Sequence, residues 1–430
     1  MGPAPEQRLP RAYWRIWWAS GISNLGDGIF LVALPLLAAR LTRSEVSISL
    51  IAAVTALPWL LLSLPIGAII DRSDRKKIMI RADLFRAAAI GALAVAVMLD
   101  AARIWMLWVM GFAIGVAEVF FDNASQAVLP AVVPAELLQK ANGRRYSVEL
   151  VANIFIGTPL GSILFAAAVA LPFGIEAGSF VLAVLLILPL RGNFHPNPTR
   201  HETASLYAEM RTGLRWLWRN PLLRTIALSL ALTNLALEIP QAVFVLFAQD
   251  TLGITETEYG FLIGVMGAGA VLGGLLGDKI VGKLGQAASI YGALGVWVVC
   301  LTSMGLYPRP WSVALAVSVQ SMAATVWNVV MVSLRQQVIP AELFGRVNSV
   351  YRWFAWGTMP IGAVVGGQVA HHIGLRANYF VAAAVMVAAV LVALPQVNTA
   401  SIVRALAGNR QSNANDDTPV RTGAAWRADP

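Results

Sequence analysis

The sequence predicts an all-α, polytopic membrane protein with twelve transmembrane helices in two parallel six-helix repeats. Hydrophobic residues make up 57% of its 430 residues and charged residues only 13%, whereas soluble domains are about 45–50% apolar and about 25% charged. The apolar residues fall in runs of roughly 20, the length with which a helix crosses about 30 Å of hydrocarbon. Transmembrane strands are shorter and alternate apolar with polar residues, so the pattern excludes a β-barrel. Two sequence motifs recur at nearly the same offset along the chain, and this recurrence indicates two equivalent halves.

The expected transmembrane segments form two bundles of six, residues 14–190 and 222–395, after a short N-terminal segment, 1–13. They are 14–39, 46–70, 78–101, 104–127, 146–170 and 173–190, then 222–249, 258–281, 286–307, 311–337, 350–373 and 376–395. A polar linker, 191–221, contains an amphipathic stretch around Leu206 to Trp218 that is expected to lie on the membrane surface. The tail, 396–430, is polar and is expected to be disordered.

The net charge of +9 reflects membrane orientation. Arg86 lies within the third segment, and only five of the other Lys and Arg residues fall in loops opposite the N-terminus: Arg40, Arg43, Arg103, Arg309 and Arg376. Because cytoplasmic loops are rich in Lys and Arg, both termini are predicted to be cytoplasmic, with the protein in the inner membrane. Nucleic acid is therefore not needed to explain the basicity.

Several site types are excluded by the residue inventory. The single cysteine, Cys300, excludes an internal disulfide and a cysteine-based metal site. The four histidines have no spacing typical of a zinc site. Residues 14–39 are long enough to span the membrane, so they are interpreted as the first helix and not as a signal peptide.

The two motifs that recur lie in loops on the N-terminal side. Gly67-Ala-Ile-Ile-Asp71-Arg72 returns as Gly274-Leu-Leu-Gly-Asp278-Lys279, 207 positions later. Val133-Pro-Ala-Glu136-Leu returns as Ile339-Pro-Ala-Glu342-Leu at an offset of 206. Parallel six-helix halves of this kind place a substrate site near mid-membrane, where the halves meet.

The loop Gly67-Ala-Ile-Ile-Asp71-Arg72-Ser73-Asp74-Arg75-Lys76-Lys77 resembles the signature of the major facilitator superfamily, Gly-x-x-x-Asp-Arg-x-Gly-Arg-Arg/Lys. Asp74 stands where that signature has glycine. Ser23-Asn-Leu-Gly-Asp27 and the Pro-Ala-Glu-Leu loops are similar to a drug/proton-antiporter branch that includes macrolide efflux proteins and the enterobactin exporter. The resemblance covers residues 12–396. It implies a transporter that works by alternating access.

Acids inside transmembrane segments are the first candidate site residues. Each costs about 2.5–3.5 kcal/mol at a helix centre, so such residues usually face a cavity or a partner. Asp27, the pair Glu118 and Asp122, and the pair Asn234 and Glu238 lie on segments that line the central cavity in the family that this chain resembles. They are predicted to bind protons and attract cationic substrate. The alternative is a structural role, with hydrogen bonds to Ser23, Asn123 or Asn153.

A proton gradient is the expected energy source. Burial disfavours the charged form of a carboxyl group, and a second acid nearby disfavours it further. Each proton that enters down 100 mV contributes about 2.3 kcal/mol, enough to drive a solute outward roughly fiftyfold. The glycines Gly264, Gly267 and Gly269 form a packing face, because no strand precedes them and no Walker lysine follows. ATP and other cofactors are therefore not expected.

The loop motifs are predicted to form a conformational gate. The resemblance implies that Asp71 holds the cytoplasmic gate, and its carboxylate is expected at the start of the eleventh helix near Ser349 and Tyr351, where the helix dipole favours an anion. Glu136 and Glu342 are expected to bind the basic cluster in the same way. The gate set is Gly67, Asp71, Arg72, Arg75, Gly274, Asp278, Glu136 and Glu342.

Three further features have a local interpretation. Gly157, Pro159 and Gly161 in the fifth segment, and Pro360 and Gly362 in the eleventh, are expected to break or kink their helices, with ordinary small-residue packing as the alternative. Arg86 is expected to extend its side chain to the cytoplasmic headgroups. Glu149 is expected to pair with Arg144 or Arg145.

The function predicted from these features is export of amphipathic drugs or siderophore-like metabolites, coupled to protons, by a monomer. An importer, a lipid flippase and a non-transporting sensor are the alternatives. An enzyme is not expected: the Gly-x-Gly-Asp motif of intramembrane aspartyl proteases is absent, because Asn24 occupies its first glycine position.

Overall fold

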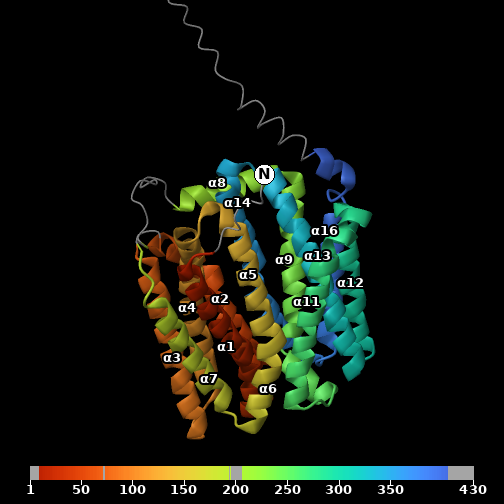
Figure 1. Cartoon of the computed structure of the whole chain (residues 1–430). Coiled ribbons are helices and arrows are strands. Elements are labelled where there is room, and N and C mark those ends of the chain that lie inside the picture. Colours follow the sequence, from red (N-terminus) through yellow and green to blue (C-terminus); the bar gives the residue numbers. More distant parts are fainter. Residues whose placement is uncertain (1–8, 71–72, 193, 195–205, 405–430) are drawn as a thin grey trace, which may run out of the picture.

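The computed structural model describes residues 9–70, 73–192, 194 and 206–404. Within this part of the chain all regular structure is helical, and two groups of long helices stand side by side (Figure 1). We call the end of the bundle where the first helix begins the proximal face, and the opposite end the distal face.

The first group contains four long helices, a fifth segment made of three consecutive helical pieces, and a shorter sixth helix. They are α1 (Arg11–Leu41), α2 (Glu45–Ile70), α3 (Arg75–Met98), α4 (Ile104–Val132), the continuous α5 (Leu138–Leu150), η2 (Val151–Gly157) and α6 (Thr158–Ala167), and α7 (Leu171–Ile187). A short 3-10 turn, η1 (Ala135–Leu137), precedes α5. Helix α7 packs against α1 and α3, and α4 packs against α2 and α3. These contacts make α1 and α7 neighbours although they are far apart in the chain.

The second group repeats this order. Its segments are α9 (Pro221–Gln241) with α10 (Phe244–Leu246) and η3 (Phe247–Thr251), then α11 (Glu256–Leu284), α12 (Gln286–Leu306), α13 (Pro310–Val338), α14 (Ala341–Gly357) with α15 (Met359–His372), and α16 (Ala377–Ala393). Eight of the described helices are long and apolar enough to cross a membrane, and two shorter apolar helices are α7 and α16. The predicted fold class is confirmed.

Two predicted segments start eight or nine residues earlier than expected, whereas the other helix starts differ by at most three residues. The fifth begins at Leu138 instead of residue 146, and the eleventh at Ala341 instead of residue 350. The first extension is polar, Gln139-Lys-Ala-Asn-Gly-Arg, and the second, Ala341-Glu-Leu-Phe-Gly-Arg-Val-Asn-Ser, mixes polar and apolar residues. A polar stretch carries no apolar signal, so the limit of the apolar run marks where the hydrocarbon ends and not where the helix ends.

Two equivalent hydrogen bonds express the internal repeat. The Tyr13 hydroxyl donates to the backbone oxygen of Ala141 at 3.0 Å, between the first and fifth segments. The Tyr351 hydroxyl donates to the backbone oxygen of Leu223 at 2.7 Å, between the eleventh and seventh segments. Both donors are buried. In each half, the bond joins the first segment of the bundle to the fifth. The tyrosine lies on the first segment in one half and on the fifth segment in the other.

The linker helix α8 (Leu206–Arg219) lies across the proximal face, as Figure 1 shows, and packs against α14 and α9. Its Leu217 is fully buried. The ring of Trp218 stacks on Phe354 of α14, with centroids 6.4 Å apart. The predicted amphipathic helix therefore exists, and its apolar face is used at least in part for packing against the second bundle.

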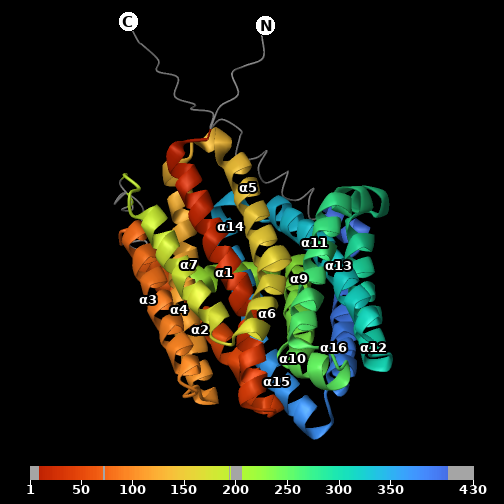
Figure 2. The ribbon, with the colours of Figure 1, turned by 60° about the horizontal axis from the view of Figure 1, so that its bottom comes forward.

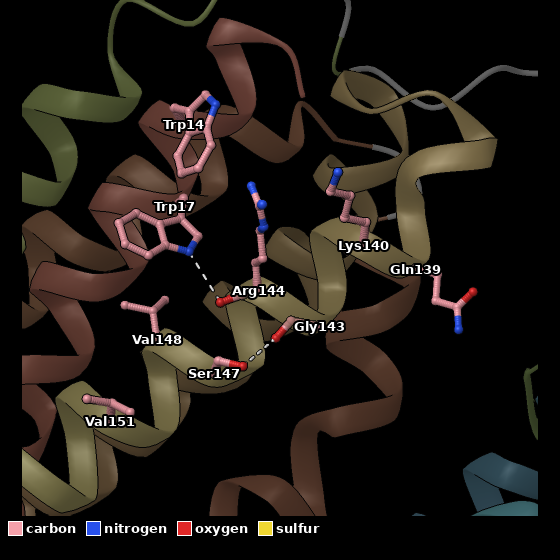
Figure 3. A pocket seen from close by; sticks show the side chains of 9 residues that line it. All are labelled: Trp14, Trp17, Gln139, Lys140, Gly143, Arg144, Ser147, Val148 and Val151. Carbon is pink, nitrogen blue, oxygen red and sulfur yellow. Dashed lines mark hydrogen bonds between the residues drawn. The ribbon is translucent and has the colours of Figure 1, made fainter. Parts of the chain in front are cut away.

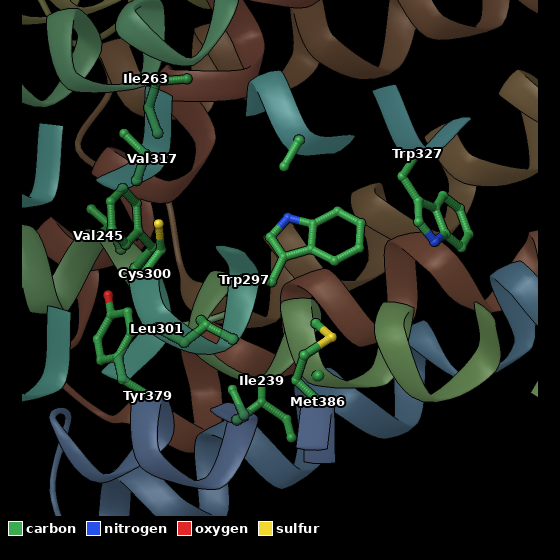
Figure 4. Close-up of a cluster of buried hydrophobic side chains, with 14 of the residues drawn as sticks. Ile239, Val245, Ile263, Trp297, Cys300, Leu301, Val317, Trp327, Tyr379 and Met386 are labelled. Atoms are coloured by element: carbon green, nitrogen blue, oxygen red, sulfur yellow. The ribbon is translucent and has the colours of Figure 1, made fainter. Parts of the chain in front are cut away.

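The core of the second bundle is aromatic at its centre. Figure 4 shows Trp297, Tyr379 and Met386 packed among aliphatic side chains such as Ile239, Leu301 and Val317. The Trp297 indole donates to the backbone oxygen of Gln320 at 3.2 Å, so its polar atom is satisfied. Outward, large apolar side chains remain exposed, including Met98 at 72% and Val299 at 67%. In a protein whose interior is already well packed, such a belt is the surface that meets lipid.

The two bundles meet along two pairs of helices. Helix α2 packs on α15, and α6 with η2 packs on α11; Figure 2 shows α6 and α11 from the side where α1 and α5 come forward. Glycines make these contacts close: a side chain at Gly367 would collide with Ser49, and one at Gly264 would lie 3.0 Å from Pro159. Ser162 of α6 donates to the backbone oxygen of Thr257 at 3.1 Å.

Candidate functional site

The first bundle contains a buried arginine in the middle of α3. Arg86 is only 4% exposed and forms an ion pair with Asp83, which is fully buried. Its guanidinium lies 4.2 Å from the ring centroid of Phe180 and 4.6 Å from that of Phe121. The expectation that Arg86 reaches the headgroups is therefore wrong. A buried acid one turn away and two aromatic faces stabilise the cation inside the bundle.

Asp27 of α1 meets a second carboxyl group, that of Glu176 on α7, within hydrogen-bonding distance. Glu176 is fully buried, and the Ser179 hydroxyl lies 3.1 Å from its Oε2. No N–H or O–H donor of the described residues reaches Glu176 Oε1. Two carboxylates have no hydrogen atom to share, so a hydrogen bond between them requires that one is protonated. The geometry of this pair thus fits the storage of one proton.

The local sequence explains how α1 and α7 come so close at this point. Gly26 precedes Asp27, and a Cβ atom at Gly26 would collide with the side chains of Glu176 and Ser179. Gly28 follows Asp27, and a Cβ atom at Gly28 would collide with the backbone of Asn153 in η2. The small residues around Asp27 let three segments converge on one carboxyl group, as they do in closely packed membrane helices.

Glu118 and Asp122 of α4 lie beside the same arginine. Arg86 interacts electrostatically with Asp27 and Glu118, and Asp122 interacts with Arg86 and Asp27. Of the predicted acids, the structure therefore brings three together around one cation. Sequence reasoning did not include Asp83 and Glu176, although an acid within an apolar segment is the signal that singled out the other three.

Glu118 also connects this cluster to the boundary between the bundles. It accepts a hydrogen bond from the Trp59 indole of α2. The Trp59 ring stacks on Trp356 of α14, with centroids 4.7 Å apart and an interplanar angle of 23°. One hydrogen bond and one aromatic contact thus connect Glu118 to the other bundle.

Asn234 and Glu238 of α9 lie apart from this cluster. The Asn234 amide donates to the backbone oxygen of Ala355 at 2.6 Å, which gives it a structural partner. Glu238 is half-buried, and no charged group of the described chain acts on it. A Cβ atom at Gly362 of α15 would lie 2.8 Å from Glu238 Cβ. Of the four predicted acids, three therefore lie together in the first bundle, and Glu238 lies alone in the second.

The predicted gate is only partly visible. Asp71 and Arg72 lie outside the described residues, and the surroundings of Gly67 and the side chain of Glu342 lie outside the description as well. Arg75 begins α3, and its N–H donates to the backbone oxygen of Phe194 at 3.3 Å. Asp74 caps this helix by accepting from the Lys77 N–H at 3.2 Å. The departure from glycine at this position therefore gives α3 a favourable N-cap.

Two gate expectations need correction. Ser349 and Tyr351 do not lie at a helix start, because α14 begins at Ala341, directly after Pro340. Gly274 and Asp278 are exposed, and no atom lies within 4 Å of a Cβ placed at Gly274. The close approach on α11 occurs at Gly269 and Gly273, which face α13. Glu136 is exposed on η1.

The two glycine and proline segments differ. The fifth segment stays helical through Gly157 and Pro159, because α5, the π-helical η2 and α6 follow one another without a gap. Gly157 and Gly161 let this segment pack closely against the backbone of α1. The eleventh breaks at Thr358, between α14 and α15, and Pro360 lies in the first turn of α15. Glu149 pairs with Arg145 at 3.3 Å, one of the two partners expected for it.

At the distal face, two ion pairs and one histidine–carboxylate contact join the bundles. Arg40 donates to both carboxylate oxygens of Glu256, each at 2.7 Å. Arg43 lies 3.4 Å from Asp250, and His371 lies 3.5 Å from Glu45. Each contact links the first bundle to the second, so this end of the interface is closed. We call these three contacts the distal latch.

The twelve-segment arrangement and the charged residues enclosed within it define a major facilitator transporter, a class that moves solutes and is not an enzyme. Solved structures share the fold: the nucleoside transporter NupG (D323A mutant) has a TM-score of 0.76, at 11% identity, over 89% of this chain and 99% of that chain. A bacterial homologue of the iron transporter ferroportin in an inward-facing state has a TM-score of 0.69, at 18% identity, over 90% and 99%.

The chain belongs to the MFS_3 family, described as transmembrane secretion effectors, which matches residues 8–414. It is 27% identical over 402 residues to macrolide efflux protein A of Streptococcus pyogenes, covering 90% of this chain and 96% of the relative. It is also 27% identical over 381 residues to the multidrug efflux pump Tap of Mycolicibacterium fortuitum, covering 85% and 90%. The resemblance predicted from the loop motifs is confirmed.

Proposed function

We propose that the protein exports amphipathic, drug-like molecules from the cytoplasm in exchange for protons, by alternating access. The proximal face is then cytoplasmic, as the excess of Lys and Arg in its loops favours. Both bundles lie in one chain, so a monomer suffices. In this proposal the structure represents a state closed toward the outside by the distal latch.

The shared hydrogen bond between Asp27 and Glu176 is the observation that carries the proposal. Loss of its proton leaves two carboxylates in contact, with Arg86 as the nearby cation. Such a pair is unfavourable away from water. The doubly charged pair therefore favours a conformation in which water, a proton or a cationic substrate reaches the two carboxylates. Proton binding and substrate binding thereby compete for one site, which is the requirement for exchange.

The path from this site to the conformational change runs through Glu118. A charge change at Asp27 alters the electrostatic balance at Arg86 and Glu118. Glu118 holds Trp59, and Trp59 packs on Trp356 of the other bundle. Protonation can thus bias how the bundles meet, as a population shift requires.

The proposed substrates follow from the names of the relatives, a macrolide efflux protein and a multidrug efflux pump. Siderophore-like metabolites, expected from the sequence, share the amphipathic character and belong in the same test. Protons supply the energy, and no bound cofactor is part of the proposal.

The test uses purified protein in liposomes, with labelled erythromycin and ethidium as probes and an imposed pH gradient. Wild type should move the probes against their gradient, and an uncoupler should stop the movement. Asp27→Asn and Glu176→Gln should lose the response to the pH gradient at least tenfold. Asp100→Asn is the matched control, because Asp100 is an exposed acid whose positive φ of 52° asparagine also adopts. Transport that ignores the uncoupler, or a full response by both buried variants, would end the antiport proposal.

A further inference from the structure

A groove of about 720 Å³ lies at the proximal end of the first bundle, between α1 and α5. Figure 2 shows these two helices side by side on the outer surface. Figure 3 shows the side chains that line the groove: Trp14, Trp17, Gln139, Lys140, Gly143, Arg144, Ser147, Val148 and Val151. None of these described residues belongs to the buried charge cluster, so the groove is separate from the proposed proton site.

The groove combines cations with indole rings. Lys140 and Arg144 lie one helical turn apart on α5, and both are exposed. The Arg144 guanidinium lies 5.6 Å from the Trp14 ring centroid, and the Trp17 indole donates to the backbone oxygen of Arg144 at 3.2 Å. No acidic residue is among the described residues of the lining. The groove therefore attracts anions, and its tryptophans suit the boundary between water and hydrocarbon.

Toward mid-membrane the same helix face turns apolar. Val148 and Val151 line the groove, and Phe155, 53% exposed, follows one turn further on. At 1.5 Å per residue, Arg144 and Phe155 are separated by about 16 Å along the helix axis. The surface thus changes from cationic to apolar over a distance that matches a headgroup and the upper part of an acyl chain.

We propose that this groove binds an anionic phospholipid of the cytoplasmic leaflet. The phosphate would lie at Lys140 and Arg144, and one acyl chain would follow Val148, Val151 and Phe155. The placement in that leaflet rests on the orientation in the proposed function. The charge excludes a cationic drug as the preferred occupant. The bound lipid would hold α5 against α1, the helix that carries Asp27, so the lipid would support the geometry of the proton site.

The test measures lipid retained by the purified full-length protein, by native mass spectrometry. The probes are palmitoyl-oleoyl phosphatidylglycerol and its phosphatidylcholine counterpart, offered as an equal mixture. Wild type should retain phosphatidylglycerol in preference. A basic residue near an anionic membrane surface contributes about 1 kcal/mol, so Lys140→Gln or Arg144→Gln should lower retention about fivefold, and both together about 30-fold.

Two further variants keep the test decisive. Gly143→Leu fills the groove without removing a cation, since no atom lies within 4 Å of a Cβ at Gly143, and it should also displace the lipid. Lys283→Gln removes an exposed charge at the end of α11, outside the groove, and should leave lipid retention unchanged.

Equal retention by wild type and the double variant, or equal retention of both lipids, would overturn the proposal. Groove variants that lose ethidium binding while keeping phosphatidylglycerol would instead assign the groove to substrate. Asp27→Asn should leave lipid retention unchanged. A failure of the proton-coupling proposal can therefore be distinguished from a failure of the lipid proposal.

Discussion

Removal of the bidentate contact between Arg40 and Glu256 should open the distal face more often. The pair is partly exposed, with side-chain exposures of 43% and 24%. Exposed ion pairs contribute about 0.2–1 kcal/mol, and bidentate geometry places this pair at the upper end. A loss of about 1 kcal/mol raises the ratio of distal-open to distal-closed protein about fivefold, because 1.4 kcal/mol corresponds to a factor of ten. This increase is the expected effect of Arg40→Gln or Glu256→Gln.

The assay is cysteine labelling at position 49. Ser49 is 1% exposed and faces Gly367 of the other bundle, so Ser49→Cys should react with a membrane-impermeant maleimide only when the distal face opens. The native Cys300 is replaced by serine in all proteins. Arg40 also lies 4.8 Å from Phe165 within its own bundle, so a double-mutant cycle is needed to isolate the pair. A coupling free energy near zero, with labelling rates unchanged in both single variants, would refute the latch.

Three other changes test the packing around the site. Arg86→Met should lower thermal stability by about 3 kcal/mol in a melting experiment, because it leaves Asp83 as a buried charge without its partner; a stable Arg86→Met protein would contradict the buried ion pair. Trp59→Phe keeps the stacking surface but loses the hydrogen bond to Glu118, so proton-driven transport should fall about tenfold while the protein still inserts and purifies normally. Tyr351→Phe should cost about 1 kcal/mol of stability, measured by chemical denaturation, and an unchanged midpoint would show that this hydroxyl contributes nothing.

Apolar runs predicted the number and order of the helical segments because the hydrocarbon thickness imposes one length on every spanning helix. The same signal missed the helix starts at Leu138 and Ala341, where turns that are polar or of mixed polarity precede the apolar run. The Pro-Ala-Glu-Leu repeat correctly marked two equivalent places, since η1 precedes α5 and Pro340 precedes α14.

The candidate site was predictable only in part. Asp27, Glu118 and Asp122 could be selected because an acid in an apolar segment needs a partner. Which partner each one has depends on the neighbouring helices, and α7 supplies Glu176 from a segment far along the chain. Arg86 was misjudged for the same reason. Its distance from the helix start suggested an extended side chain, whereas Phe121 and Phe180 enclose it.

By itself, the sequence determined the class of the protein. Composition required a membrane, run length required helices, and the duplicated loop motifs required two equivalent halves. Only the tertiary structure decided that Asp83 and Glu176 join the three predicted acids of the first half around Arg86, while Glu238 stands alone in the other half. The physical reason is that helix periodicity sets the face on which a residue lies, whereas a charge in hydrocarbon is stabilised by partners from other helices.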